Sequence, residues 1–327
     1  MKSLRDGLDP GAKEAAEAVG VAAEADVLLF NAGIDRSSQQ RLLRLLSCRK
    51  RRPNVFVILL SEGGDPGAAY KISRSLQAVY QRFICALPGY SKSAATIILT
   101  GAHELVIGDD GEMGPLDVQM SKKDTLAGYE SGLTVLSALP ALHERAYLAW
   151  EYFFLQIEEA SSGSITVKTA SHAASELTTG LFAPVYGQID PLQIGEASRA
   201  MAIGKEYGRR LNKNSQNLRP DALEKLVSEY PDHGFVIDRT EAKTLFYRVR
   251  QPTANEETFF ERIDDLCAVE NGRRFGLIDF LNEEVVALQP EAPKGEQDHA
   301  TNGTQSPTTV NGVDQASQTP GANVSAN

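Results

Sequence analysis

The sequence lacks two features that would direct the chain into or across a membrane. No run of roughly 18 uncharged apolar residues occurs, so no membrane-spanning helix is expected. Residues 1–24 are mixed, charged and alanine-rich, without the apolar core of a signal peptide behind a basic start. We therefore expect a soluble, cytoplasmic protein with no integral membrane span.

Cysteine is scarce, and basic residues are outnumbered by acidic ones. Cys48, Cys85 and Cys267 lie far apart without C-x-x-C spacing, which fits neither a disulfide framework nor a zinc site and favours reduced, buried thiols. The formal net charge of -10 gives no general attraction to nucleic acid or an anionic membrane. The one basic run, at 49–52, follows an apolar-periodic stretch, where cations complement the C-terminus of a helix.

Common ligand-binding motifs are also missing. The sequence contains no H-E-x-x-H, no Walker glycine-lysine motif and no dinucleotide fingerprint, so we expect no metal and no cofactor. No internal repeat has a fixed period, which argues against a solenoid or a propeller.

What is present is an alternation of short apolar runs and amphipathic stretches over residues 25–118, which is typical of a layered α/β fold. Buried strands are expected at 27–30, 55–60, 83–87 and 105–107. Ser37 and Ser38 are expected to cap the first helix. From about 124 to 229 the apolar spacing becomes mainly helical, and one late strand is expected at 235–237.

These patterns predict three parts in the chain. Residues 1–24 form an N-terminal extension, and residues 25–288 form the main domain, with an α/β core over about 25–120 and a helical part over about 121–288. Residues 289–327 are rich in Pro, Gly, Ser, Thr, Asn and Gln, with few large apolar residues to offset the entropy of ordering. We expect this tail to be disordered.

Two features of the expected core meet at one edge of its sheet. Gly63 and Gly64 end the second strand, and Ser93 begins a helix after the third, so parallel packing brings them to the edge where α/β proteins bind ligands. Glycines and a helix N-terminus both present backbone N–H groups. A serine hydroxyl among such donors is placed to attack a carbonyl, whose developing negative charge the N–H groups would meet. Taken separately, each feature also fits a plain turn or helix start.

The order of three motifs adds a family resemblance. The stretch 58–118, with LSEGG at 60–64, SAAT at 93–96 and MGPLDVQ at 113–119, resembles the serine dehydrogenase proteinase family, which is related to signal peptide peptidase A and to the Clp protease proteolytic subunit. Weaker similarity covers most of the chain from 26 to about 250, at EL (176–177), GLFAP (180–184), QIDP (188–191) and HGFVID (233–238). The resemblance implies a Clp/crotonase-like core of repeated β-β-α and βαβ units, a peptide or protein substrate and a homo-oligomer.

The resemblance also assigns roles to individual residues. Ser93 matches the nucleophile of the family, the N–H groups of Gly64 and Ala94 match its oxyanion-hole donors, and Gly63 supports the turn. The chain departs from the commoner pattern at Lys92, and at Ala95, which replaces a frequent glycine. We expect Ala95 to narrow the space beside the nucleophile, and Lys92 either to depress the pKa of the serine or to reach solvent.

The general base is not assigned by the same motifs. The Clp subunits use a histidine after the fourth strand, but residues 114–119 contain none. Signal peptide peptidase relatives use a lysine, whose neutral form requires burial or nearby positive charge. Lys122 is our first candidate, with Lys123 and Lys168 as alternatives.

Other polar residues near the motifs are expected to be structural. His103 and His172 should be packing or surface residues, since they lie outside the position of the family's base. Glu62 and Asp65 are expected to cap the helix that follows the glycines. Asp117 and Asp190 could position a base or stabilise turns, and turns are favoured.

The favoured interpretation is a serine peptidase that cleaves peptide bonds through an acyl-enzyme, with a Ser–Lys dyad. One alternative is a catalytically inactive oligomeric scaffold of the same fold, which the missing base favours. Another is a crotonase-like acyl-CoA enzyme, in which the same donors stabilise a thioester enolate without a serine nucleophile. A serine-reactive probe separates the first interpretation from the other two.

Overall fold

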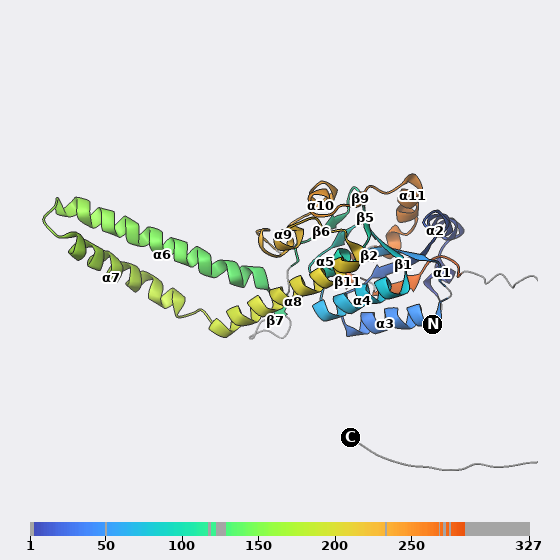
Figure 1. Ribbon diagram of the computed structural model, residues 1–327, viewed down its shortest axis with the longest axis horizontal. Helices are drawn as coiled ribbons and strands as arrows, with labels where there is room; N and C mark the ends of the chain where they lie inside the picture. Colours follow the sequence, from blue (N-terminus) through green and yellow to red (C-terminus); the bar gives the residue numbers. More distant parts are fainter. Residues whose placement is uncertain are drawn as a thin grey trace, which may run out of the picture. The chain divides into compact units, whose positions relative to one another are not determined.

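A mixed sheet of short apolar strands lies at the centre of the fold. The computed structural model describes residues 3–49, 51–116, 119–121, 129–232, 234–267, 269–270, 273–274 and 276–284. Residues 1–286 form one compact unit. Within the described ranges, the main sheet has the strand order β12-β1-β2-β3-β5-β9 (Figure 1).

The strands of this sheet are β1 (Ala25–Asn31), β2 (Asn54–Leu60), β3 (Arg82–Leu87), β5 (Glu104–Ile107), β9 (Val249–Arg250) and β12 (Leu277–Phe280). Neighbours run parallel except β12, which pairs antiparallel with β1. Short strands pair outside the sheet: β4 (Tyr90–Ser91) with β6 (Glu112–Met113), β7 (Gln119–Ser121) with β8 (Tyr129–Ser131), and β10 (Val269–Glu270) with β11 (Arg273–Arg274). The expected α/β class and the first four strands of the core are confirmed.

Helices cover both faces of the sheet, because successive strand residues point to opposite sides. Leu28 and Phe30 of β1 face one cluster of buried side chains, and Val27 and Leu29 face the other. The first cluster includes residues of α3 (Arg36–Cys48), α4 (Pro66–Val79), α5 (Ala94–Thr100), α8 (Pro191–Ser215), α9 (Ala222–Ser228) and α10 (Arg239–Leu245). The second includes residues of α2 (Pro10–Ala22) and α11 (Ala254–Arg262), with the short helices α1 (Leu4–Gly7) and α12 (Asp264–Cys267) beside it.

The expected helical part is present. Helices α6 (Gly132–Ser161) and α7 (Val167–Tyr186) lie side by side as a hairpin, named here the hairpin α6–α7 (Figure 1). The indole Nε1 of Trp150 donates to Ser175 Oγ across it at 3.1 Å. Helix α6 also contacts α8, which in turn packs on α4 and α5. None of the described helices is both long and apolar enough to cross a membrane.

Three local predictions are wrong. The N-cap of α3 is Asp35, not Ser37 or Ser38, because the Asp35 carboxylate accepts from the Ser38 N–H at 2.7 Å. The late strands of the main sheet are β9 and β12, whereas the segment 235–237 makes only an isolated bridge through Ile237. Cys48 is exposed rather than buried, since it lies at the end of α3.

Residues 3–24 take part in the core. Ala12, Ala16 and Val19 of α2 are buried against β1 and α11, so the stretch that we expected to be an extension supplies a covering helix. The tail at 289–327 lies outside the described residues, and its disorder stays a prediction.

The basic run at 49–52 follows α3 as expected, but its first residue is buried. The Nε atom of Arg49 lies 3.1 Å from Asp26 Oδ1, and its guanidinium lies 4.1 Å from the ring centre of Phe280. The Tyr80 hydroxyl donates to Asp26 Oδ2 at 2.9 Å. Burial, and after it the Asp26 carboxylate, raises the pKa of Tyr80. This buried pair lies near the N-terminal end of β1.

Candidate functional site

The turn after β2 and the helix after β3 meet at the C-terminal edge of the sheet, as the sequence predicted. The Lys92 N–H donates to Ser61 O at 2.9 Å. The Ser91 hydroxyl donates to Leu59 O, also at 2.9 Å. These bonds hold the segment that leads into Ser93 along the end of β2.

Ser93 has an unusual backbone conformation. Its φ is 56° and its ψ is -121°, and it stands at the N-cap of α5 without capping the helix through its side chain. A positive φ at a residue with a Cβ is strained, and such strain clusters at functional sites. A strained serine between a strand and a helix is the arrangement of a nucleophile elbow. Ser91 and Ala95, two residues to either side, are small and buried, which permits the sharp turn.

Gly63 lies directly against the serine. Its φ is +102°, and a Cβ at this position would lie 2.7 Å from Ser93 Cβ and 3.0 Å from Ala94 N. Its N–H donates to Ser61 Oγ at 3.1 Å. No larger residue fits here, so Gly63 is what allows the turn after β2 to contact the start of α5.

Gly64 is held by Ile34, a residue that sequence reasoning missed. Gly64 has a φ of +140°, and a Cβ on it would lie 2.1 Å from Ile34 O. The Ile34 N–H donates to Gly63 O at 2.8 Å, and the Asp65 N–H donates to Ile34 O at 2.7 Å. Ile34 acts here through backbone atoms, which are the same in every residue type, so no signal in the sequence marks it.

The two expected oxyanion donors are not used by the fold. Within the part of the chain that the structure describes, no acceptor takes a hydrogen bond from the N–H of Gly64 or of Ala94. The Ala94 N–H belongs to the first residue of α5, where helical N–H groups have no intrahelical partner. Unpaired donors beside a serine are what an oxyanion hole requires.

Of the two roles expected of Lys92, the structure contradicts the second, because the side chain does not reach freely into solvent. Its Nζ lies 2.7 Å from Glu112 Oε1 and donates to Phe235 O at 3.3 Å, and its side chain is largely buried. A Cβ on Gly114 would lie 2.8 Å from Lys92 Cδ, so the glycine makes room for the lysine chain. The charge of Lys92 is therefore compensated by Glu112, and the side chain ties the Ser93 segment to its neighbours.

The third sequence motif lies beside the first two. Met113 and Ile237 exchange two backbone hydrogen bonds, of 3.0 and 2.9 Å. The Gly114 N–H donates to Ser91 O at 3.1 Å, and the Thr96 hydroxyl donates to Gly114 O at 2.8 Å. The described part of this motif is thus fixed against α5, and three motifs far apart in sequence meet in space.

The candidate bases are not assembled at this site within the described residues. Lys122, Lys123 and Asp117 lie outside the described residues. Lys168 is exposed in the first turn of α7, which packs on α6 and not on the sheet (Figure 1). His172 is exposed on the same helix, with its Nδ1 3.8 Å from Glu176 Oε2.

The acidic residues near the motifs have local roles. Asp65 caps α4 as expected, through the Ala68 N–H at 2.5 Å. Asp190 was expected to stabilise a turn but instead caps α8 through the Leu192 N–H at 2.9 Å. Glu62 was expected to cap a helix but instead accepts from the Tyr90 hydroxyl at 2.9 Å.

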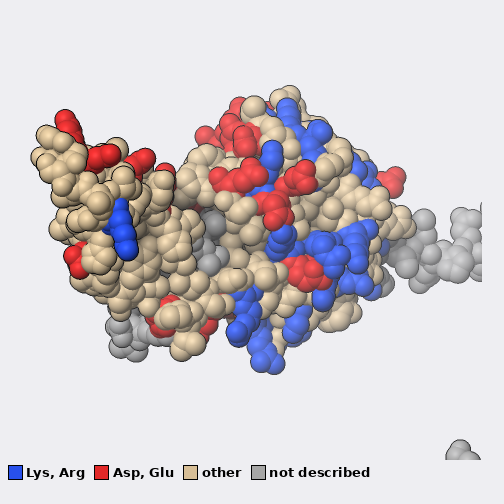
Figure 2. All heavy atoms as spheres, turned by 60° about the vertical axis from the view of Figure 1, so that its left-hand side comes forward, with Lys and Arg blue, Asp and Glu red and all other residues tan. Residues whose placement is uncertain are grey.

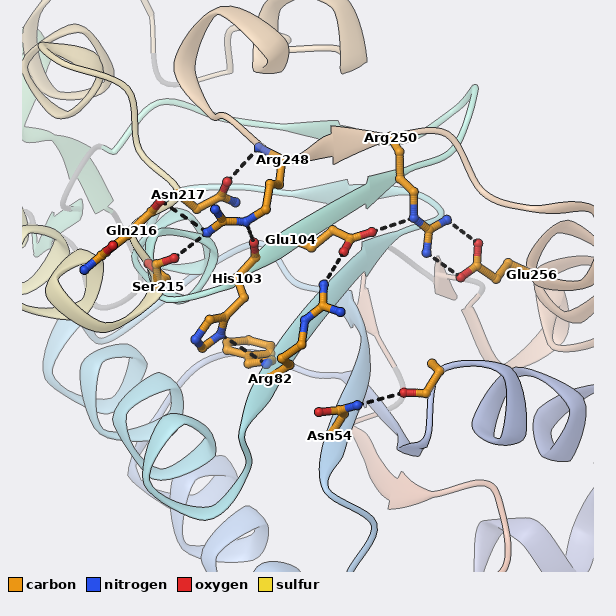
Figure 3. Close-up of polar contacts among 12 residues, drawn as sticks. Asn54, Arg82, His103, Glu104, Ser215, Gln216, Asn217, Arg248, Arg250 and Glu256 are labelled. Carbon is orange, nitrogen blue, oxygen red and sulfur yellow. Dashed lines mark hydrogen bonds and ion pairs between the residues drawn. The ribbon is translucent and has the colours of Figure 1, made fainter.

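His103 lies past the far end of α5 from Ser93. Its Nδ1 accepts from the Phe83 N–H at 3.1 Å, and its backbone oxygen accepts from Arg248 (Figure 3). Burial, and then the charges of Arg248 and Arg82, lower the pKa of the imidazole. A neutral ring that accepts from the backbone fits the packing role expected of His103.

A chain of ion pairs lies near His103, at the edge of the sheet where β3 and β5 begin, which is its N-terminal edge (Figure 3). Glu104 lies 2.7 Å from Arg82 and 2.6 Å from Arg250, and Arg250 lies 2.6 Å from Glu256. These residues line a cavity of about 410 Å³. Each of the four charged groups has an opposite neighbour, so the network is suited to holding strands β5 and β9 to helix α11.

A larger cavity, of about 1080 Å³, lies between α3 and the segment 279–284, which flanks the N-terminal half of β1. Arg41, Arg44 and Cys48 line it, and neither Ser93 nor the glycine turn does. Among the residues that the structure describes, no group of His, Cys, Asp and Glu is arranged to hold a metal ion.

Comparisons with known proteins add little to this geometry. No family model matches the chain, and no curated protein matches it. One similar solved structure is the 1510-N membrane-bound stomatin-specific protease, in a serine-to-alanine mutant form. It is 12% identical, with a TM-score of 0.28 over 44% of this chain and 66% of that one, so this chain spans just under two thirds of its length. A likeness of this size supports neither a fold nor an activity.

Proposed function

We propose that this protein is a Clp/crotonase-like serine peptidase that cleaves peptide bonds through an acyl-enzyme on Ser93. The Ser93 hydroxyl would attack the scissile carbonyl, and the N–H groups of Gly64 and Ala94 would bind the oxyanion of the tetrahedral intermediate. A lysine, Lys122 first, would take the proton from the serine and return it to the leaving amine.

The conformation of Ser93 is the observation that carries this proposal. A serine that served only to begin α5 would adopt an extended backbone and cap the helix with its hydroxyl. Ser93 does neither, and it holds a positive φ instead. This strained backbone is expected where the hydroxyl of a nucleophile has to be held beside the unpaired N–H groups of Gly64 and Ala94.

Labelling with a fluorophosphonate tests the nucleophile. We expect the probe to modify the folded protein at Ser93 and Ser93→Ala to abolish labelling without unfolding the chain. Ser73→Ala is the matched control, because Ser73 is an equally buried serine on α4, outside the turn around Ser93. Ser93 is only 1% exposed, so labelling also shows whether a reagent reaches the hydroxyl. Labelling that survives Ser93→Ala, or an unreactive wild type, would overturn the assignment, and the second result would favour the scaffold.

Three alanine variants test the base. Because adjacent residues of an extended segment face opposite sides, we propose that one of Lys122 and Lys123, and not both, serves Ser93. We expect Lys122→Ala to abolish peptidase activity and Lys123→Ala and Lys168→Ala to retain most of it. In the wild type the rate should rise with pH through a lysine pKa lowered by desolvation, and Lys122→Ala should lose that limb. Full activity in all three variants would exclude the dyad.

A further inference from the structure

The cavity of about 1080 Å³, named here the α3 cavity, has one wall built from a single side of α3. Residues three or four apart lie on the same side of a helix. The residues of α3 that line the cavity include a row at this spacing: Ser37, Arg41, Arg44 and Cys48. The facing wall is the end of β12 with the segment that follows it. Sites for small molecules have volumes of roughly 300–1000 Å³, so a small organic molecule fits here.

Four arginines line the α3 cavity, and two of them are already paired by the fold. Arg5 Nη2 lies 2.6 Å from Glu283 Oε1, and the buried Arg49 lies beside Asp26. The carboxylate of Asp279, which also lines the cavity, accepts from two backbone N–H groups, at 2.7 and 2.9 Å. These charged groups hold the walls together and are not available to a ligand.

The other two arginines are available. Arg44 is exposed, and Arg41 donates to the backbone oxygen of Gly276 at 3.2 Å. Within the residues that the structure describes, neither arginine has a carboxylate partner, and the remaining acid of the lining, Glu284, is exposed. Two guanidinium groups against one carboxylate leave an excess of one positive charge. Guanidinium groups bind oxyanions through paired N–H donors, so the excess matches a ligand with a single negative charge.

The surroundings of the α3 cavity favour an anion although the chain as a whole is acidic. Residues 36–61 contain seven Lys and Arg and no Asp or Glu, whereas the net charge of the chain is -10. In Figure 2, Lys and Arg gather on the body of the protein, and the hairpin α6–α7, on the left, carries few of them. Leu45 and Phe280 add apolar atoms to the lining, as do the aliphatic stems of the arginines. The matching ligand therefore combines an anionic group with an apolar body.

We propose that the α3 cavity binds a small organic monocarboxylate. Its carboxylate accepts from Arg41 and Arg44, and its apolar part lies against Leu45 and Phe280. Cys48 lies one helical turn beyond Arg44 on the same wall, so a bound ligand covers its thiol. The cavity shares no lining residue with Ser93 or the glycine turn, so this proposal is independent of the peptidase activity.

Protection of Cys48 tests the site with a defined probe, 2-naphthoate. Cys48 is exposed, whereas Cys85 is buried and Cys267 is half-buried. Iodoacetamide alkylates the thiol, and mass spectrometry of the peptide that contains Cys48 gives the rate. We expect millimolar 2-naphthoate to slow this alkylation with a saturating dependence on concentration. The uncharged 2-naphthamide, which has the same rings, and acetate, which has no apolar body, should each protect much less.

Variants of α3 connect this protection to the arginines. Protection is the ratio of the rates without and with 2-naphthoate in one variant, so a change in the reactivity of the thiol itself cancels. Arg44→Gln should raise the concentration for half-protection several-fold, and Arg41→Gln combined with it by at least about tenfold, because charged donors to the carboxylate are lost. Arg36→Gln is the matched control, because Arg36 is an exposed arginine of α3 that does not line the cavity.

Several results would overturn the proposal. They are an unreactive Cys48, no protection by 2-naphthoate, equal protection by 2-naphthamide, and a half-protection concentration that neither arginine variant changes. A shift in Arg36→Gln as large as that in Arg44→Gln would also overturn it. Circular dichroism checks the fold of each variant, and the exposed position of Arg44 keeps the single variant informative if the combined variant unfolds.

Discussion

The two ends of the central sheet are built by opposite means. At the C-terminal edge, Ser93 holds a strained backbone between small residues, and the Gly64 N–H has no acceptor among the described residues. At the N-terminal edge, charged side chains are paired, with Asp26 beside Arg49 and the ion-pair chain of Figure 3 across the later strands.

The difference separates stability from reactivity. Paired charges and filled hydrogen bonds hold strands in place but leave no group to engage a ligand. A strained residue beside unpaired donors lowers stability and keeps groups ready for a developing charge. The N-terminal edge therefore stabilises the fold, and the strain at the C-terminal edge lowers its stability. Substitutions at the N-terminal edge should change the free energy of unfolding, and those at the C-terminal edge should also change the labelling of Ser93.

The largest loss of stability is expected at the N-terminal edge. Asp26→Ala leaves the Arg49 guanidinium buried without its carboxylate, and breaking a buried pair costs about 3–5 kcal/mol. Urea unfolding measures this cost. The double variant Asp26→Leu with Arg49→Met removes both charges and should recover most of the loss. A cost below about 1 kcal/mol for Asp26→Ala would show that this edge is not what secures the sheet.

The next effect is expected at the C-terminal edge. Gly64→Ala places a Cβ 2.1 Å from Ile34 O at a φ of +140°, and strain and overpacking together cost about 2–4 kcal/mol. Unlike Asp26→Ala, it should also abolish fluorophosphonate labelling in the fraction that remains folded. Gly33→Ala is the control, because a Cβ there meets nothing within 4 Å, and it should keep both stability and labelling. Normal labelling of Gly64→Ala would separate the turn from the reaction.

A smaller effect depends on pH. Burial alone would raise the pKa of Glu256, but hydrogen bonds from Arg250 and from the Thr253 N–H outweigh it, and the pKa is lowered. A carboxylate whose pKa is lowered by folding contributes stability at pH values above its unfolded pKa of about 4.3. That contribution is lost as the pH falls through the folded pKa.

Glu256→Gln should therefore be about 1–2 kcal/mol less stable at pH 7 and lose less than the wild type in acid. Urea unfolding at pH 7 and below pH 4 measures both. Parallel acid profiles for the two proteins would contradict this expectation.

The smallest effect is expected where the ion-pair chain reaches solvent. The Arg82 side chain is 52% exposed, and exposed ion pairs contribute about 0–1 kcal/mol. Arg82→Met should thus lower stability by less than about 1 kcal/mol, and added salt should shrink the difference. A loss as large as that of Asp26→Ala would remove the distinction between the buried and exposed charges of this edge.

The strands of the core were predictable because a parallel strand buried on both faces reads as a continuous apolar run, as in β2. Strands β9 and β12 were missed because they are two and four residues long and are defined by pairing with distant strands. Helix α2 was missed because the residues that it buries include Ala12 and Ala16, which give a weak apolar pattern.

The motifs predicted which segments of the candidate site meet, since glycines and a serine at strand ends are visible in a sequence. They did not predict the positive φ of Ser93 or the close backbone contact of Ile34 with Gly64, because both are properties of backbone geometry. The partner of Lys92 was also missed, since Glu112 comes near only through the pairing of β4 with β6.

The pairing of β12 with β1 has a consequence for folding during synthesis. Leu28 pairs with Phe280, which is synthesised about 250 residues later. At a translation rate of about 5–20 residues per second, β1 therefore emerges from the ribosome roughly 12–50 seconds before its antiparallel neighbour. During that time one side of β1 is an open edge that another nascent chain can join. A translational pause before β12 prolongs this exposure, so codon choice ahead of residue 277 should influence the yield of soluble protein.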